Sequence, residues 1–143
     1  MNIVYTAGTW DCFHFGHLNL IKKAKELGDK LIVGVSTDEL VLEYKKYSPI
    51  IPFKERFEII KSLKYVDEVF KQEKRNKLAA LNHFKFNIWA IGDDWHGNDY
   101  YMEISKKFKN EGIETAWIKY TKGISSTIIR EKLNHRFQKD NMD

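Results

Sequence analysis

The chain has 143 residues, of which 43% are hydrophobic and 31% are charged. This length and composition fit one domain with a hydrophobic core and exclude a mainly disordered chain. The single cysteine, Cys12, excludes an intrachain disulfide and a cysteine-rich zinc site. The net charge of +4 suits an anionic ligand or a nucleic-acid surface and by itself selects neither.

The first residues, MNIVYTAGTW, lack a basic region followed by an apolar stretch, so no signal peptide is predicted. The longest apolar runs, such as LIVGV, are too short to span a bilayer. We therefore expect a cytoplasmic protein without membrane insertion.

The first half of the chain alternates between apolar strands and amphipathic helices. NIVYTA (2–7) and KLIVGVS (30–36) predict buried strands because they are short, apolar and rich in β-branched residues. FGHLNLIKKAKEL (15–27) and PFKERFEIIKSL (52–63) keep an apolar period of about 3.6 residues, which predicts helices. Residues 42–51, LEYKKYSPII, are predicted to form the longest irregular stretch.

The second half repeats the alternation, with strands predicted at 65–70, 87–92 and 113–120 and helices at 77–84, 99–112 and 125–137. Five strands separated by helices indicate parallel pairing through right-handed crossovers. The sequence therefore predicts an α/β protein: a single doubly wound, Rossmann-like domain over residues 1–143. Its sheet has five parallel strands, and helices cover both faces.

Ligands of doubly wound sheets bind at the carboxyl ends of the strands. Four polar or glycine-containing segments directly follow predicted strands, so we expect them to meet at one edge of the sheet: 8–17, 37–46, 92–97 and 120–127.

The segment GTWDCFHFGH (8–17) places two histidines around a predicted helix start. A helix start favours an anion through its free N–H groups and its dipole, and Gly16 lets a ligand approach the backbone closely. The rings of His14 and His17 can donate hydrogen bonds to phosphate oxygens, and their charge would match a negatively charged transition state. A zinc site needs a third protein ligand, which the surrounding sequence does not offer, so no metal site is predicted. A satisfied core histidine stays an alternative for His14.

These segments closely resemble a known family. GTWDCFHFGH resembles the HxGH signature of the nucleotidylyltransferase superfamily, and YTKGISST (120–127) resembles the RTEGIST signature of its cytidylyltransferase branch. STDE (36–39) and GDDW (92–95) match the same branch, and the similarity runs from about residue 3 to about residue 133. Length and motif set are most similar to those of the bacterial glycerol-3-phosphate cytidylyltransferases.

The resemblance implies a reaction in which CTP and a phosphorylated small alcohol give a CDP-alcohol and pyrophosphate. Glycerol 3-phosphate is the leading acceptor, and Mg²⁺ accompanies the triphosphate. The acceptor's phosphate attacks the α-phosphorus in line, without a covalent enzyme intermediate. The resemblance further implies a homodimer and a role in the biosynthesis of cell-surface polysaccharides.

The resemblance also implies roles for single residues. It implies that His14, His17 and Lys46 are catalytic. It implies that the acceptor is bound by Lys45, Arg56, Lys64 and Lys77. The alignment of the two neighbouring lysines is open by one residue, so either of them is a candidate for the triphosphate. The implied nucleotide-binding residues are Gly8, Thr9, Trp10, Asp11, Phe15, Gly16, Asp94, Trp95, Tyr120, Thr121, Lys122, Gly123, Ile124, Ser125, Ser126 and Thr127.

Plainer roles stay open for several of these residues. Ser125 would also serve as a plain helix cap, Trp95 as a packing residue, and the two lysines as part of a solvated basic loop. Asp11 would either hold its loop or aid the metal.

The chain departs from the family signature at two positions. Tyr120 stands where the signature has arginine, and Lys122 stands where it has an acid. The loss of a guanidinium removes a bidentate phosphate contact, which Lys122 or Arg130 is placed to replace.

Three alternatives to the leading function therefore stay open. The first is transfer to a sugar phosphate or an amino-acid phosphate, or transfer from ATP in place of CTP. The second is a non-catalytic nucleotide sensor of the same fold. The third, a nucleic-acid-binding domain, is less favoured because no helix carries a stripe of basic residues interleaved with aromatic ones.

Overall fold

The computed structural model describes the backbone of residues 1–142 and the side chains of residues 1–139. Five strands form one sheet in which every pairing is parallel, in the order β3-β2-β1-β4-β5. The strands are β1 (Ile3–Gly8), β2 (Lys30–Ser36), β3 (Glu68–Gln72), β4 (Ile88–Gly92) and β5 (Glu114–Ile118). The predicted five-stranded parallel sheet is thus confirmed, and its strand order reverses between β1 and β4.

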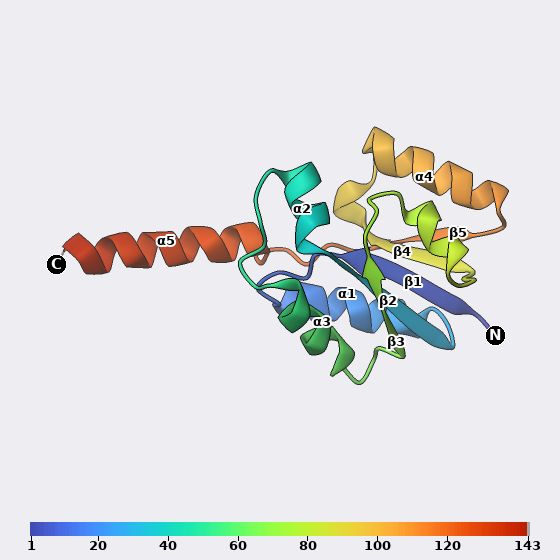
Figure 1. Cartoon of the computed structure of the whole chain (residues 1–143), viewed down its shortest axis with the longest axis horizontal. Coiled ribbons are helices and arrows are strands. Elements are labelled where there is room, and N and C mark those ends of the chain that lie inside the picture. The colour runs from blue at the N-terminus through green and yellow to red at the C-terminus, as the bar shows by residue number, and fades with distance from the viewer. Residues whose placement is uncertain (143) are drawn as a thin grey trace.

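Helices cover both faces of the sheet, as predicted (Figure 1). α1 and α3 pack on one face, and α4 and the short helix η1 pack on the other. The bounds are α1 (Phe15–Glu26), α2 (Asp38–Lys45), α3 (Phe53–Lys61), η1 (Lys77–Asn82), η2 (Asp93–Trp95), α4 (Asp99–Asn110) and α5 (Ser126–Met142).

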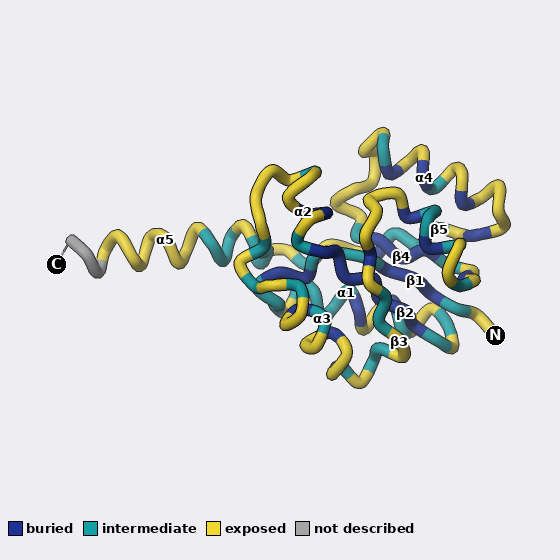
Figure 2. Tube along the Cα trace, viewed as in Figure 1, coloured by how far each residue is buried: buried dark blue, intermediate teal, exposed yellow. Residues whose placement is uncertain are grey.

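The core consists of two apolar layers, one on each face of the sheet. Figure 2 shows the buried residues in dark blue, many of them along the central strands. Successive residues of β1 point to opposite faces: Val4 joins the layer under α1 and α3, and Tyr5 joins the layer under α4. Because β1 lies in the middle of the sheet, both layers meet it. The loop that follows β1 therefore starts from the most firmly held strand.

α5 starts at the carboxyl edge of the sheet and projects away from the α/β body (Figure 1). Most of its described side chains are exposed, including those of Leu133 and Phe137. Within residues 1–142, no helix combines the length and the apolar character that crossing a bilayer requires.

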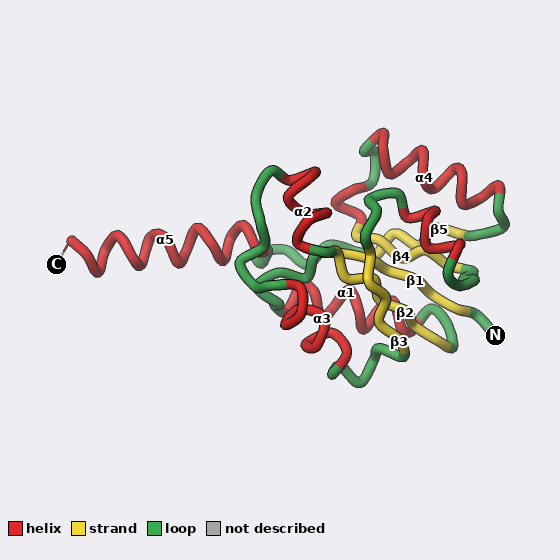
Figure 3. The backbone as a smooth tube through the Cα atoms, viewed as in Figure 1, coloured by secondary structure: helices red, strands yellow, loops and turns green. Residues whose placement is uncertain are grey.

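The structure differs from the sequence prediction in two elements (Figure 3). Residues 38–45 form α2, although 42–51 was predicted to be irregular. The oxygen of Thr37 accepts the N–H of Leu40 at 3.1 Å and caps a helix of only two turns, which is too short to show a clear period. Residues 77–82 form a 3₁₀ helix in place of the predicted α-helix.

Arg56 of α3 ties the loops at the carboxyl edge together. Its Nε donates to the carbonyl of Ile51 at 2.8 Å, and its Nη1 donates to the carbonyls of Thr9 at 2.6 Å and Ser36 at 2.8 Å. Its Nη2 forms an ion pair with Asp38 at 2.7 Å. The side chain has no exposed surface, so the expectation that Arg56 binds the acceptor is corrected: it is a structural hub.

Lys64 also requires a correction. It lies in the turn between α3 and β3, which places it at the amino ends of the strands. Its ammonium is exposed and lies 5.3 Å from the ring centre of Tyr65. Ligands of this fold bind at the opposite edge. Within one chain, Lys64 therefore does not reach the predicted site.

Replacing Arg56 with Met should lower the free energy of unfolding by about 3–5 kcal/mol, because three carbonyls, one buried and two partly buried, and one carboxylate lose the donor of a fully buried side chain. Urea unfolding monitored by circular dichroism measures this change. The matched control is Lys54→Met, which removes an exposed cation from the same helix and should change stability by less than about 0.5 kcal/mol. Equal stability of the two variants would contradict the assigned hub.

Candidate functional site

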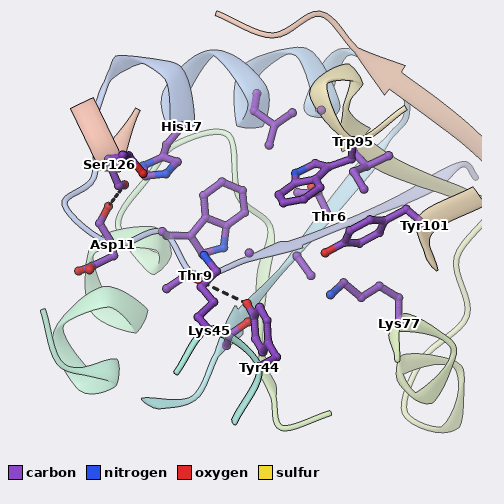
Figure 4. A pocket seen from close by; sticks show the side chains of 18 of the residues that line it. Thr6, Thr9, Asp11, His17, Tyr44, Lys45, Lys77, Trp95, Tyr101 and Ser126 are labelled. Carbon is purple, nitrogen blue, oxygen red and sulfur yellow. Dashed lines mark hydrogen bonds between the residues drawn. The ribbon is translucent and has the colours of Figure 1, made fainter. Parts of the chain in front are cut away.

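A cleft of about 260 Å³ lies at the carboxyl edge of the sheet, next to the reversal between β1 and β4 (Figure 4). Its walls come from β1, β4 and the segments that follow them, and from α1, α2, η1, α4 and the start of α5. Ten residues predicted from the sequence line it: Gly8, Thr9, Trp10, Asp11, His17, Lys45, Lys77, Trp95, Ser126 and Thr127. The fold thus brings segments that are more than a hundred residues apart into one site.

Other predicted residues stand beside the cleft without lining it: His14, Phe15, Gly16, Lys46, Asp94, Tyr120, Thr121, Lys122, Gly123, Ile124 and Ser125. Phe15 is 64% exposed at the start of α1. The hydroxyl of Ser125 accepts the N–H of Ile128 at 3.1 Å, which is the plain cap that was left open for it.

The two neighbouring lysines separate at the end of α2. Lys45 lines the cleft, whereas Lys46 has a left-handed backbone with φ of +66° and directs its ammonium to the carbonyl of Glu43 at 3.2 Å. The structure therefore places Lys45, and not Lys46, in the lining of the cleft, and a catalytic role for either lysine stays a prediction. Burial and the nearby Arg130 lower the pKa of Lys45.

His14 and His17 form a reciprocal cap at the start of α1. The N–H of Gly16 donates to Nδ1 of His14 at 3.0 Å, and the N–H of His14 donates to Nδ1 of His17 at 3.3 Å. Because each Nδ1 accepts a hydrogen bond, the neutral form of each ring carries its proton on Nε2. The rings stack with their centres 3.7 Å apart. The pair thus supplies two Nε2–H donors for an oxygen-rich ligand.

Both histidines are uncharged at neutral pH. Burial lowers the pKa of His14. Burial, followed by the neighbouring His14 and Lys45, lowers the pKa of His17 to about 3. The sequence suggested that histidine charge would match a negative transition state. In the free protein they act as neutral hydrogen-bond donors, and the positive charge of the cleft comes from other residues.

The two signature segments pack directly on each other. A Cβ on Gly16 would lie 2.9 Å from the His14 ring and 3.4 Å from the Ile124 side chain, so only glycine fits there without a shift. The amide of Asn19 donates to the hydroxyl of Thr121 at 3.3 Å. Segment 120–127 therefore backs the start of α1, which explains why most of it stands beside the cleft.

Asp11 holds the loops around the cleft. Its carboxylate accepts the N–H groups of Ile50 at 2.8 Å, Ile51 at 2.9 Å and Cys12 at 3.1 Å. Its own carbonyl accepts the hydroxyl of Ser126 at 2.7 Å (Figure 4). Both oxygens of the carboxylate are therefore engaged, which favours the loop-holding role over metal ligation.

Trp10 is a second anchor in the same loop. It has φ of +59°, is buried, and donates its indole N–H to the carbonyl of Gly34 at 2.8 Å. A Cβ on Gly8 would lie 3.1 Å from its ring, so the glycine leaves room for the indole. Trp10 therefore fixes the loop from within.

The cleft carries more positive than negative charge. Its lining includes Lys45, Lys77 and Arg130, and among the described residues only Asp11 opposes them. Lys77 is 8% exposed, and its ammonium donates to the carbonyl of Arg75 at 3.1 Å. Burial, followed by the charges of Arg75 and Lys45, lowers its pKa to about 8. A buried ammonium without a carboxylate partner indicates a site for an anion.

The cleft also has lining residues that the sequence analysis did not assign: Thr6, Ala7, Leu20, Ser36, Tyr44, Tyr47, Trp89, Ile91, Gly92, Tyr101 and Arg130. Arg130 was named only as a substitute for a missing charge, and the structure places it in the cleft. Its position four residues after Ser126 is the spacing at which a helix returns to the same face. Tyr44 was not assigned because it belongs to α2, a helix that the sequence analysis did not predict.

This arrangement is suited to holding a polyanion: two neutral N–H donors, a helix start and three cations around one cleft. Among residues 1–139, no three His, Cys, Asp or Glu side chains gather in a way that could hold a metal ion.

The His17 ring should stay neutral through the physiological pH range. We expect its NMR signals, assigned with a His17→Asn variant, to remain constant from pH 8 to pH 5. Because the unfolded chain binds a proton near pH 6.5 and the folded chain does not, wild-type stability should fall more steeply below pH 6.5 than that of His17→Asn. A titration midpoint between pH 6 and 7 would contradict this prediction.

Replacing Lys77 with Met should raise the free energy of unfolding of the ligand-free protein by about 1–2 kcal/mol at pH 7, because a buried, unpaired charge is removed. The gain should shrink from pH 8 to pH 10.5, where the wild-type side chain loses its charge in the folded and then in the unfolded chain. Urea unfolding against the exposed control Lys74→Met measures it. A lower stability of Lys77→Met would show that the ammonium is well paired.

Comparison with known proteins agrees with the geometry. Residues 5–132 match the model of the cytidylyltransferase-like family. The glycerol-3-phosphate cytidylyltransferase of Bacillus subtilis (strain 168) is 34% identical over 135 residues, which covers 93% of this chain and 98% of that protein. An FAD synthase of Pyrococcus horikoshii is 36% identical over 118 residues, covering 81% of this chain and 78% of that protein.

Among solved structures, the lipopolysaccharide core biosynthesis protein from Thermoplasma volcanium superposes with a TM-score of 0.70 at 26% identity. The match covers 87% of this chain and 99% of the other. The chain therefore belongs to the cytidylyltransferase-like family and is an enzyme that transfers cytidylyl groups.

Proposed function

We propose that the enzyme transfers CMP from CTP to a phosphorylated small alcohol, with glycerol 3-phosphate as the leading acceptor. The products are a CDP-alcohol and pyrophosphate. The observation that carries the proposal is the stacked His14–His17 pair, whose Nε2–H groups stand at the start of α1 beside Lys45 and Arg130. The relatives named glycerol-3-phosphate cytidylyltransferase, which align over nearly their whole length, support the choice of acceptor.

In the proposed reaction, an oxygen of the acceptor's phosphate forms a bond to the α-phosphorus of CTP. The bond from that phosphorus to the bridging oxygen of the β-phosphate breaks, and pyrophosphate leaves with the electron pair. CTP enters as its Mg²⁺ complex, which is the substrate. Both carboxylate oxygens of Asp11 already accept backbone N–H groups. This supports a metal that is held by the triphosphate and not by Asp11.

The protein's contribution is positioning and charge stabilisation. The histidine Nε2–H groups donate to phosphate oxygens, whose negative charge is redistributed in the transition state. Lys45 and Arg130 supply the positive charge that neutral histidines do not. Trp95 and Asp94 belong to the GDDW segment that resembles the cytidylyltransferase branch, so we assign them to the cytosine. Burial together with the neighbouring Asp93 raises the pKa of Asp94.

A homodimer acting in the biosynthesis of cell-surface polysaccharides is part of this proposal. The exposed apolar side chains of Ile50 and Leu133 are surface that a second copy would cover. The FAD synthase relatives favour a second candidate, transfer to a different phosphorylated acceptor by the same cleft.

The test is pyrophosphate release with Mg²⁺ and either CTP or ATP, against a panel of phosphorylated alcohols, sugars, amino acids and a flavin phosphate. We expect release with CTP and glycerol 3-phosphate. His17→Asn, which keeps an acceptor for the His14 N–H but lacks the Nε2–H donor, should slow turnover by about 10²-fold or more. The control His135→Ala removes an exposed histidine of α5 and should leave turnover unchanged.

Release with another acceptor alone would keep the chemistry and replace glycerol 3-phosphate. CTP binding without release from any member of the panel would favour a nucleotide sensor. Full turnover of His17→Asn would contradict the proposed role of the histidine pair.

A further inference from the structure

Arg75 occupies an unusual position at the edge of the cleft that is farther from the histidines. It lies in the segment between β3 and η1, and its guanidinium carbon is 4.2 Å from the ring centre of Tyr100 and 5.2 Å from that of Tyr44. Tyrosines from two different helices thus hold one exposed guanidinium, which restricts its motion.

Lys77 lies directly beside this group. Its ammonium donates to the Arg75 carbonyl at 3.1 Å and lies 5.9 Å from the ring centre of Tyr101. No carboxylate among the described side chains forms an ion pair with it or with Arg75. Two cations are thus held close together, one buried and one stacked, and neither has an acidic partner. Such an arrangement is unfavourable unless an anion binds there.

The cations of the cleft fall into two groups. Burial, followed by the charge of Arg130, lowers the pKa of Lys45, at the end of the cleft that contains His17 and Asp11. Lys77 lies beside Arg75, at the end that contains Tyr101 and Trp95, and burial, followed by the charges of Arg75 and of the more central Lys45, lowers its pKa. Figure 4 shows His17 and Asp11 on one side of the cleft and Lys77 and Tyr101 on the other, with Lys45 between them. A reaction between two phosphate compounds needs two anion sites that face each other.

We propose that Arg75 joins Lys77, which the resemblance already assigns to the acceptor, in binding the acceptor's attacking phosphate, and that Arg75 is a specificity-determining residue of the enzyme. The inference rests on the proposed function. Stacking on tyrosine rings leaves the edge N–H groups of a guanidinium available for a bidentate bond to a phosphate, while the lysine adds a point charge. A site with two cations selects phosphate monoesters, which carry two negative charges, over uncharged alcohols.

The test compares Arg75→Ala, Arg75→Lys and the control Lys74→Ala, which removes the same charge from an exposed side chain one residue away. Arg75→Ala should raise the KM for the acceptor about tenfold or more and change the KM for CTP by less than about twofold. Arg75→Lys, which keeps the charge but loses the planar fork, should fall between Arg75→Ala and wild type. Lys74→Ala should match the wild type in both constants.

An unchanged acceptor KM in Arg75→Ala, or an equal rise in the KM for CTP, would overturn the inference. A second measurement separates this failure from failure of the proposed function. Calorimetric titration with inorganic phosphate uses the His17→Asn background, in which the histidine end is already impaired. There Arg75→Ala should weaken phosphate binding about tenfold, and Lys74→Ala should leave it unchanged. Absence of phosphate binding in that background, or equal affinity with and without Arg75, overturns the inference even if no acceptor in the panel reacts.

Discussion

The cleft depends on two buried or nearly buried charged groups that bond to loop backbone. Arg56 donates to the carbonyls of three segments, and Asp11 accepts N–H groups from two of the same regions. Loops that meet at a sheet edge present unpaired backbone groups, and burying these without partners would be costly. One cation and one anion satisfy them. The side chains that face the ligand are thereby placed before it arrives, which is a condition for electrostatic catalysis.

The same loops carry positive charges that repel one another in the free protein. Lys77 and Arg75 stand side by side without a carboxylate, and Lys45 stands near Arg130. Their repulsion disfavours the ligand-free state, and in the proposed reaction bound phosphates would relieve it. The histidines avoid adding to it, because burial keeps them neutral while they still donate. Positive charge and hydrogen-bond direction are thus supplied by different residues.

Much of this was predictable from the sequence. The parallel pairing of five strands followed from the alternation of elements, and the HxGH and GISST segments pointed to one edge because carboxyl ends of parallel strands meet there. Side-chain direction was not predictable at single-residue precision. Lys45 and Lys46 are neighbours, yet the left-handed end of α2 turns only one of them into the cleft. The helix that makes this distinction was itself missed, because its two turns give no clear period.

Arg56 and Arg130 show why residue type alone does not decide function. Both are arginines near the carboxyl edge. The N–H groups of Arg56 donate to carbonyls and a carboxylate inside the fold. Arg130 lies in the cleft, 3.9 Å from the carboxylate of Asp11, whose two oxygens already accept backbone N–H groups. A guanidinium whose donors are all satisfied stabilises the structure. Arg130, whose Nη2 makes only long hydrogen bonds to Tyr47 at 3.5 Å and Thr127 at 3.4 Å, stands beside a helix start, where it supplies positive charge to the cleft.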